Sequence, residues 1–98
     1  MEGIDTLKDE IREDYQIPPY FPDSSLKRII QEGIAYFEML NPGCDFEKDL
    51  VYRNLLKIRS YYSYVHALND FRENYKVDIL TWQAETPVQT ADDGDKGS

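Results

Sequence analysis

The amino-acid sequence predicts an all-α protein, a small helical bundle with one long central helix, a short helix at the N-terminus and another short helix at the end. Apolar residues recur at steps of three and four through most of residues 5–84, which is the period of an α-helix. Strand signals are almost absent, because there is no alternating run and no Asn-Gly hairpin. The chain has 98 residues, of which 41% are hydrophobic and 31% charged, a globular composition. We therefore expect one helical domain over residues 1–85 and a flexible acidic tail over residues 86–98.

Residues 5–14 are expected to form the first, short helix. Asp5 or Thr6 can cap it, and Leu7 and Ile11 lie on one face. Three prolines then fall within residues 18–22, and proline both fixes its own φ and disfavours helix at the preceding residue. The sequence therefore predicts an extended segment after the first helix.

A second helix is expected over residues 24–41, with caps available in the Asp-Ser-Ser sequence of residues 23–25. Gly33 lies inside its apolar pattern, where glycine costs about 1 kcal/mol relative to alanine. Either another backbone approaches closely at Gly33 or the glycine is a tolerated defect. The Asn-Pro-Gly sequence at residues 41–43 predicts the end of this helix.

The third helix is expected to be the long one, with Asp45 as its cap. No Gly or Pro occurs from Leu50 until Pro87. A single helix over residues 46–84 would be about 58 Å long, too long for the second helix to cover. We therefore predict a break near residues 69–74 and a distinct last helix over residues 75–84, the alternative being burial by neighbouring copies.

Charge and cysteine content exclude several classes of protein. The net charge is −8 at pH 7, with −4 in residues 1–14 and −2 in residues 86–98, which argues against a nucleic-acid binder that relies on bulk positive charge. The single cysteine, Cys44, excludes an internal disulfide framework and a Cys-based zinc site. Without a signal-peptide pattern or a long apolar run, we expect a soluble cytosolic product with no membrane partner.

No catalytic residue, metal ligand or cofactor is predicted. His66 is the only histidine, and the nearby Ser60 and Ser63 lie at helical offsets that do not build a hydrolytic triad. The Asp-Asp-Gly-Asp sequence at residues 92–95 lacks the ligand spacing and closing Glu of a calcium loop. No glycine-rich phosphate loop occurs.

Basic residues gather on the predicted third helix, where Arg53, Lys57 and Arg59 are possible DNA- or partner-facing side chains. One interpretation is a solvated face with Asp49 and Arg53 paired at i, i+4. The other is a positive stripe that meets phosphate or an acidic partner.

Tyrosines are the stronger anomaly, with eight in 98 residues. Those at 61, 62 and 64 point in different directions around a helix, so one narrow core stripe cannot take all three. Tyrosine is enriched at interfaces because its ring packs while its hydroxyl stays hydrated. Core packing and a subunit interface both remain open for this series. The candidate subunit-interface residues are Tyr52, Tyr61, Tyr62, Tyr64 and Tyr75.

Residues 15–85 resemble the head–tail connector family of tailed bacteriophages, also called adaptor or head-completion proteins. Four segments carry the resemblance: residues 17–23 (IPPYFPD), 41–46 (NPGCDF), 49–57 (DLVYRNLLK) and 69–80 (NDFRENYKVDIL). The resemblance implies a non-enzymatic all-α subunit that assembles as a homo-oligomeric ring of about twelve copies. Such a ring docks under the portal protein, extends the DNA channel without sequence-specific binding, and joins the head to the next neck or tail component.

The same resemblance implies a location in the virion at the head–tail interface, after synthesis in the host cytoplasm. It also implies that the last helix and the residues after it reach the portal. The portal-binding candidates are Leu80, Thr81, Trp82, Gln83 and Val88. Two other classes remain open: a small adaptor or regulatory domain that binds one protein through residues 61–64 and Trp82, and a DNA-binding module that uses the three basic residues.

Overall fold

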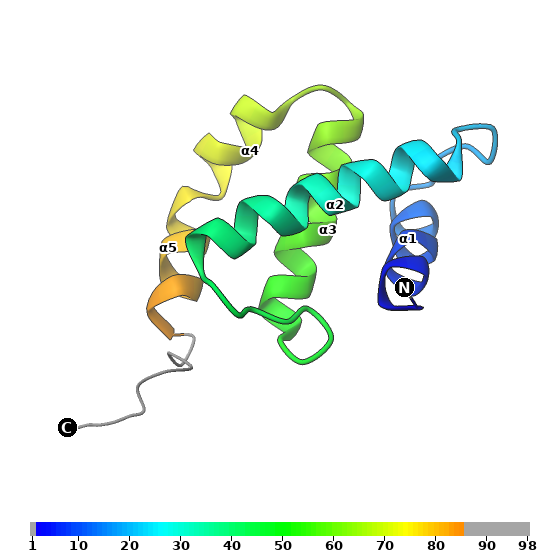
Figure 1. Cartoon of the computed structure of the whole chain (residues 1–98). Coiled ribbons are helices and arrows are strands. Elements are labelled where there is room, and N and C mark those ends of the chain that lie inside the picture. Colours follow the sequence, from blue (N-terminus) through cyan, green and yellow to red (C-terminus); the bar gives the residue numbers. More distant parts are fainter. Residues whose placement is uncertain (1, 86–98) are drawn as a thin grey trace.

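The computed structural model describes residues 2–85, and these form five α-helices and no strand (Figure 1). The prediction of an all-α class is confirmed. The tail over residues 86–98, which includes Val88, lies outside the described residues. The helices are α1 (Glu2–Asp14), α2 (Asp23–Leu40), α3 (Leu50–Tyr64), α4 (Leu68–Asn74) and α5 (Lys76–Glu85).

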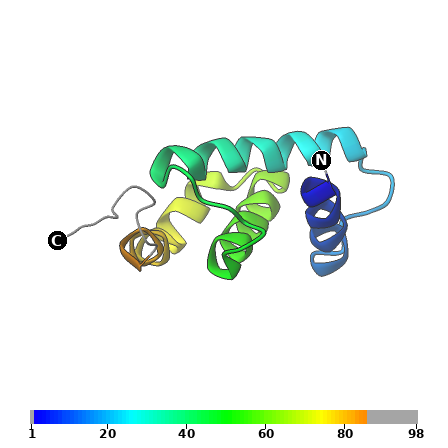
Figure 2. The same ribbon diagram turned by 60° about the horizontal axis from the view of Figure 1, so that its bottom comes forward.

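Helix α2 lies across the other four helices as a separate layer (Figure 2). Its buried residues, Leu26, Ile30, Gly33 and Phe37, repeat at steps of four, three and four, so one face of α2 covers the core. Helices α1, α3 and the α4–α5 pair lie side by side beneath it. The core therefore runs along the underside of α2, from α1 at one end to α5 at the other.

Gly33 marks the place where α2 and α3 cross. A Cβ atom at this position would lie 2.7 Å from Leu56 Cδ1, closer than carbon atoms pack. The close approach considered for Gly33 is therefore present, but the neighbour is the side chain of Leu56 and not a backbone.

Helix α3 differs most from expectation. Its N-cap is Asp49 and not Asp45, because Asp49 Oδ1 accepts from the backbone N–H groups of Val51 and Tyr52 at 3.0 and 3.2 Å. Asp45 instead accepts from the Glu47 N–H at 3.0 Å, in the turn before the helix. Four fewer residues are therefore helical at this end than the sequence predicted.

The predicted continuation of this helix to residues 69–74 is wrong, because α3 ends at Tyr64. His66 adopts a left-handed backbone conformation with φ 60°. The Ala67 N–H then donates to the Tyr62 carbonyl at 2.7 Å and the His66 N–H to the Ser63 carbonyl at 3.1 Å. This pair of bonds is a Schellman motif, which satisfies the last carbonyl groups of a helix and turns the chain. A second break at Tyr75 separates α4 from α5, one residue beyond the predicted region.

Helices α1 and α2 also begin differently from the predicted caps. Helix α1 starts at Glu2, ahead of Asp5 and Thr6, and ends in another Schellman motif with Gln16 at φ 51°. The N-cap of α2 is Pro22, with no side-chain capping bond. Asp23 does not cap α2, because its carboxylate pairs with Arg12 and Lys8 of α1 at 2.7 and 3.1 Å.

Candidate interaction surfaces

Most of the tyrosine excess is used for packing inside the chain. Tyr52 is 1% exposed, and its ring stacks on Trp82 with centroids 5.3 Å apart. Trp82 is itself only 3% exposed, and its indole N–H donates to Asp49 Oδ2 at 2.8 Å. The structure thus places Tyr52 in the core and not at a surface, so it offers no area to a neighbouring subunit.

The remaining candidate tyrosines are half-buried and joined by ring contacts. Tyr61 stacks on Tyr15 with ring centroids 4.7 Å apart. The ring centroids of Tyr62 and Tyr75 are 6.0 Å apart. Tyr64 meets Phe21 edge to face at 4.9 Å. These side chains join α3 to the α1–α2 connection and to the junction of α4 and α5, and only their outer parts are available to a partner.

Burial also raises the pKa values of three tyrosine hydroxyls and one thiol. It raises the pKa values of the Tyr15, Tyr52 and Tyr75 hydroxyls, with Cys44 as a further cause at Tyr52. Burial likewise raises the pKa of the Cys44 thiol. A thiol that stays protonated is a poor nucleophile, so Cys44 has the character of a packing residue.

Two of the three predicted basic residues are neutralised within the chain. Arg53 donates to both carboxylate oxygens of Glu10, at 3.1 Å from Nε and 2.7 Å from Nη2. Lys57 Nζ lies 2.6 Å from Asp14 Oδ2 and 3.4 Å from Glu10 Oε1. The expected pairing of Arg53 with Asp49 is wrong. The Asp49 carboxylate instead caps α3 and accepts the indole N–H of Trp82.

These ion pairs shift the titration of their members. The hydrogen bond from Arg53 holds the pKa of Glu10 below its usual value. At Lys57, burial lowers the pKa, but the carboxylates of Asp14 and Glu10 outweigh it and the net shift is upward. Both charges are thus present at neutral pH and face each other across the α1–α3 contact.

Arg59 is separated from this ionic cluster. Its guanidinium lies 4.7 Å from the centroid of the Tyr36 ring, a cation–π contact, and burial lowers its pKa. Its Nη1 atom is buried without a hydrogen-bond partner. The three basic residues therefore do not form one exposed stripe.

The predicted portal-binding residues of α5 divide between two faces. Leu80 is 56% exposed and Thr81 is also exposed, whereas Trp82 is in the core. Gln83 is half-buried and donates from Nε2 to the Leu40 carbonyl at 2.8 Å, which ties α5 to the end of α2. Val77, which the sequence analysis did not single out, is 71% exposed and lies one turn before Leu80. The outward face of α5 is therefore apolar around Val77 and Leu80.

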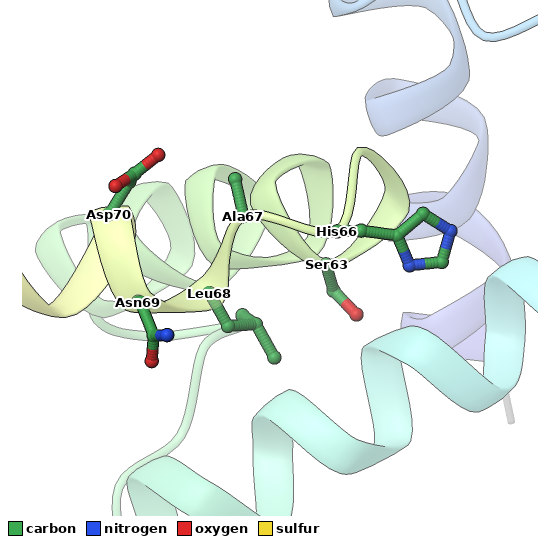
Figure 3. Close-up of a pocket in the computed structure, with 6 residues that line it drawn as sticks. All are labelled: Ser63, His66, Ala67, Leu68, Asn69 and Asp70. Atoms are coloured by element: carbon green, nitrogen blue, oxygen red, sulfur yellow. The ribbon is translucent and has the colours of Figure 1, made fainter.

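A hollow of about 500 Å³ lies at the corner between α3 and α4. Figure 3 shows its six lining residues, among them Ser63, His66 and Asp70, with the three side chains pointing in different directions. None of the hydrogen bonds found within residues 2–85 joins these three. The corner accordingly does not form the nucleophile–base–acid arrangement of a hydrolytic triad.

Tyr20 is an exposed aromatic residue that sequence reasoning missed. It is 86% exposed, and no ring pair in residues 2–85 includes it. It lies at the tip of a β-turn closed by the Phe21 N–H donating to the Pro18 carbonyl at 3.0 Å. The proline-rich sequence predicted an extended segment here, and the turn signal of Pro19 before Tyr20 was the available clue.

The Arg12 side chain holds this turn by hydrogen bonds to its carbonyl groups. Its Nη1 donates to the Pro18 carbonyl at 2.7 Å, and its Nη2 donates to the Phe21 carbonyl at 2.9 Å and to Asp23 Oδ1 at 2.7 Å. Charge-assisted bonds of this kind are strong and directional. Residues 18–21, which we call the Tyr20 turn, are thus held in one conformation with the tyrosine outward.

Two further observations concern metal binding and membrane crossing. Within residues 2–85, no three His, Cys, Asp or Glu side chains are grouped so that they could hold a metal ion. None of the five helices combines the length and the apolar character that crossing a membrane requires.

Comparison of this chain with protein-family models, with curated proteins and with solved structures found no match in any of the three.

Proposed function

We propose that this protein is a structural, non-enzymatic ring subunit of a bacteriophage neck, a head–tail connector. It docks under the portal, extends the DNA channel and joins the head to the next neck or tail component. The proposal starts from the resemblance of residues 17–23, 41–46, 49–57 and 69–80 to that family. In the fold these four segments are the Tyr20 turn, the α2–α3 connection, the start of α3, and α4 with the start of α5.

The observation that carries most weight is the set of large apolar side chains that so small a chain leaves exposed. Large hydrophobic side chains are normally buried in preference to others, and a group of exposed ones marks an interaction surface. Here Leu50 is 74%, Val77 71% and Leu80 56% exposed, although Val77 and Leu80 lie on a helix whose other face holds Ile79 and Trp82 in the core. A helix that carries exposed apolar side chains opposite its buried face is suited to a position between the body of its own subunit and a partner, although Asp78 is exposed beside Val77.

The acidic charge of the chain also suits a channel component. DNA that must slide through a ring should not be gripped, because each neutralised phosphate adds salt-dependent affinity. Arg53 and Lys57 are already occupied by Glu10 and Asp14 and are not free for phosphates. This arrangement favours passage of DNA without specific binding and disfavours the alternative of a DNA-binding module.

The other alternative is an adaptor domain that binds one protein through residues 61–64 and Trp82. The burial of Trp82 argues against it. Trp82 is 3% exposed, so a partner could reach it only after α5 moved away.

Immunogold electron microscopy of phage particles tests the proposal. An antibody raised against the full chain is expected to label one vertex of the head, at the neck. Labelling over the capsid or along the tail, or particles that lack the protein altogether, would remove the proposal. A monomer in isolation would not, because connector rings can require the portal as a template.

A further inference from the structure

We infer that α1 is a detachable helix, held on α2 and α3 by ion pairs, which leaves as a unit while the other four helices stay folded. In its docked position α1 covers the basic side chains of α3, so that its release would make them accessible. The inference goes beyond the proposed function and does not rest on it. It is carried by the way in which ion pairs and ring contacts are divided among the five helices.

Ion pairs are concentrated on α1. Every ion pair found within residues 2–85 includes a residue of this helix, and only the pair of Lys8 with Asp9 is internal to it. The others join α1 to α2 and α3: Lys8 and Arg12 with Asp23, Asp5 with Lys27, Glu10 with Arg53 and Lys57, and Asp14 with Lys57. In the described part of the chain, ion pairing therefore serves the docking of α1 and not the packing of α2–α5 on one another.

Helices α2–α5 are held together by aromatic packing. The Phe37 ring of α2 contacts one ring from each of the other three helices. Its centroid lies 5.4 Å from that of Tyr52 in α3, 6.4 Å from that of Phe71 in α4 and 5.5 Å from that of Trp82 in α5. Helix α1 has no aromatic residue. Departure of α1 would therefore leave these ring contacts in place.

The position of α1 allows it to leave without breaking contacts among the other helices. Figure 2 shows α1 at the edge of the lower layer, beyond α3 and away from α4 and α5. Its share of the core is three aliphatic side chains, those of Ile4, Leu7 and Ile11. Segments at the edge of a fold with few buried apolar contacts can open separately, at a free energy below that of global unfolding.

The surface under α1 carries charges of both signs. Its bases are Lys27, Arg53 and Lys57, and the side chains of the last two are only 17% and 16% exposed while α1 is docked. Its acids are Asp23 and Glu47, whose carboxylate lies against Gly3. Residues 1–14 have a net charge of −4. Release thus separates an acidic helix from a surface with one more base than acid, and α1 acts as a cover that keeps Arg53 and Lys57 from other acidic groups.

Amide hydrogen exchange of the full chain, followed by NMR, tests whether α1 opens by itself. We expect the amides of residues 8–14 to share one opening free energy and to exchange at least about thirtyfold faster than the most protected amides of α3. Low urea concentrations should scarcely change their exchange, whereas exchange in α3 should rise steeply, because global unfolding exposes far more surface. Equal exchange and equal urea dependence in the two helices would overturn the inference. So would rates that fall gradually from Glu2 to Asp14, which is the pattern of a fraying end.

Salt and a single substitution test whether ion pairs hold α1. Raising the salt concentration from about 0.01 M to 1 M shortens the Debye length from about 30 Å to 3 Å, and we expect exchange in α1 to rise about tenfold. At low salt, Glu10→Gln, which removes the partner of Arg53, should raise it about fivefold. The matched control, Glu13→Gln, makes the same change at an exposed site of α1 and should raise it less than about twofold. Exchange that responds neither to salt nor to Glu10→Gln would mean that apolar packing alone holds α1, and the inference would fail.

Charge reversal should populate the released state. With Glu10→Lys and Asp14→Lys together, α1 presents cations to Arg53 and Lys57, and we expect the protection of its amides to fall at least about hundredfold. The amides of α3 and α5 should remain protected, and the fluorescence of Trp82 should not change, because the aromatic packing of these helices does not include α1.

The matched control for charge reversal is Asp9→Lys with Glu13→Lys. It makes the same charge change on the exposed side of α1, where the Asp9 side chain is 75% exposed and Glu13 is exposed as well. Helix α1 should stay protected in this control. Loss of protection throughout the chain on Glu10→Lys with Asp14→Lys, or an α1 that stays protected in that variant, would overturn the inference.

Discussion

The Asp49 carboxylate joins two helices, because one oxygen caps α3 and the other accepts the Trp82 indole N–H of α5 at 2.8 Å. Asp49 and Trp82, which are 33 positions apart in the sequence, are thus joined by one hydrogen bond. The contact holds α5 against the core by its Trp82 face and leaves Val77 and Leu80 outward.

Removing this carboxylate should destabilise the protein more than removal of an ordinary cap. For Asp49→Ala we expect a loss of about 2 kcal/mol, since a cap contributes about 1 kcal/mol and a hydrogen bond to a charged acceptor a similar amount. Asp49→Asn should cost less, because an amide oxygen still caps the helix. Urea unfolding followed by Trp fluorescence measures both, with Asp45→Ala as the control. Equal losses for Asp45→Ala and Asp49→Ala would contradict the assignment of the cap.

Glycine at the two left-handed positions should stabilise the protein. His66 and Gln16 have φ values of 60° and 51°, which cost a side-chain-bearing residue about 1 kcal/mol relative to glycine. We expect His66→Gly and Gln16→Gly each to raise the free energy of unfolding by about 0.5–1 kcal/mol. Thermal unfolding gives the measurement, and His66→Ala, which keeps the strain, should bring no gain. Destabilisation by His66→Gly would mean that α3 does not end where the structure has it.

Gly33→Ala should destabilise the protein although alanine is the better helix former. Alanine would gain about 1 kcal/mol of helix propensity, but its Cβ would collide with Leu56 at the α2–α3 crossing, and overpacking costs about 1–3 kcal/mol. Chemical denaturation compares this variant with Ala35→Gly, which changes propensity alone at an exposed site of α2. An increase in stability on Gly33→Ala would show that the helices do not cross so closely.

The ionic contact between α1 and α3 should make stability depend on pH in the acid range. The pKa of Glu10 is lowered in the folded state from its ordinary value of 4.5, chiefly by the hydrogen bond from Arg53. A carboxyl group with a depressed folded pKa contributes stability that is present above its unfolded pKa and is lost as the pH falls through its folded pKa. The contribution of Glu10 should therefore be complete at pH 7 and decline below about pH 4.5.

Glu10→Gln measures that contribution. Because the Glu10 side chain is 37% exposed and partly screened, we expect a loss of about 1 kcal/mol at pH 7 and almost none near pH 2. The matched control is Asp9→Asn on the same helix, whose side chain is 75% exposed and which should change little at either pH. Equal losses at pH 7 and pH 2 would rule out the ion pair as the cause.

The fold class and the parts with strong local signals could be predicted from the sequence. The apolar period placed the second helix at residues 24–41 against an observed Asp23–Leu40, and the Asn-Pro-Gly turn contains Gly43 at φ 86° as expected of such a turn. The end of α3 could not be predicted, because histidine occupies a position where glycine usually gives the signal.

Interactions between distant residues account for the rest. The spacing of Asp49 and Arg53 favoured a pair within one helix, but Arg53 meets Glu10 from 43 positions away. Only the packing of α5 decides that Tyr52 and Trp82 are buried together. The Tyr20 turn was missed because its rigidity comes from Arg12, six residues before the first carbonyl that it holds.

Under the proposed connector function, a cryo-electron microscopy map of the phage neck tests the central claim most directly. We predict a ring of identical all-α subunits directly below the portal. A neck whose density is fully explained by other chains, with no annulus built from this one, would contradict the account.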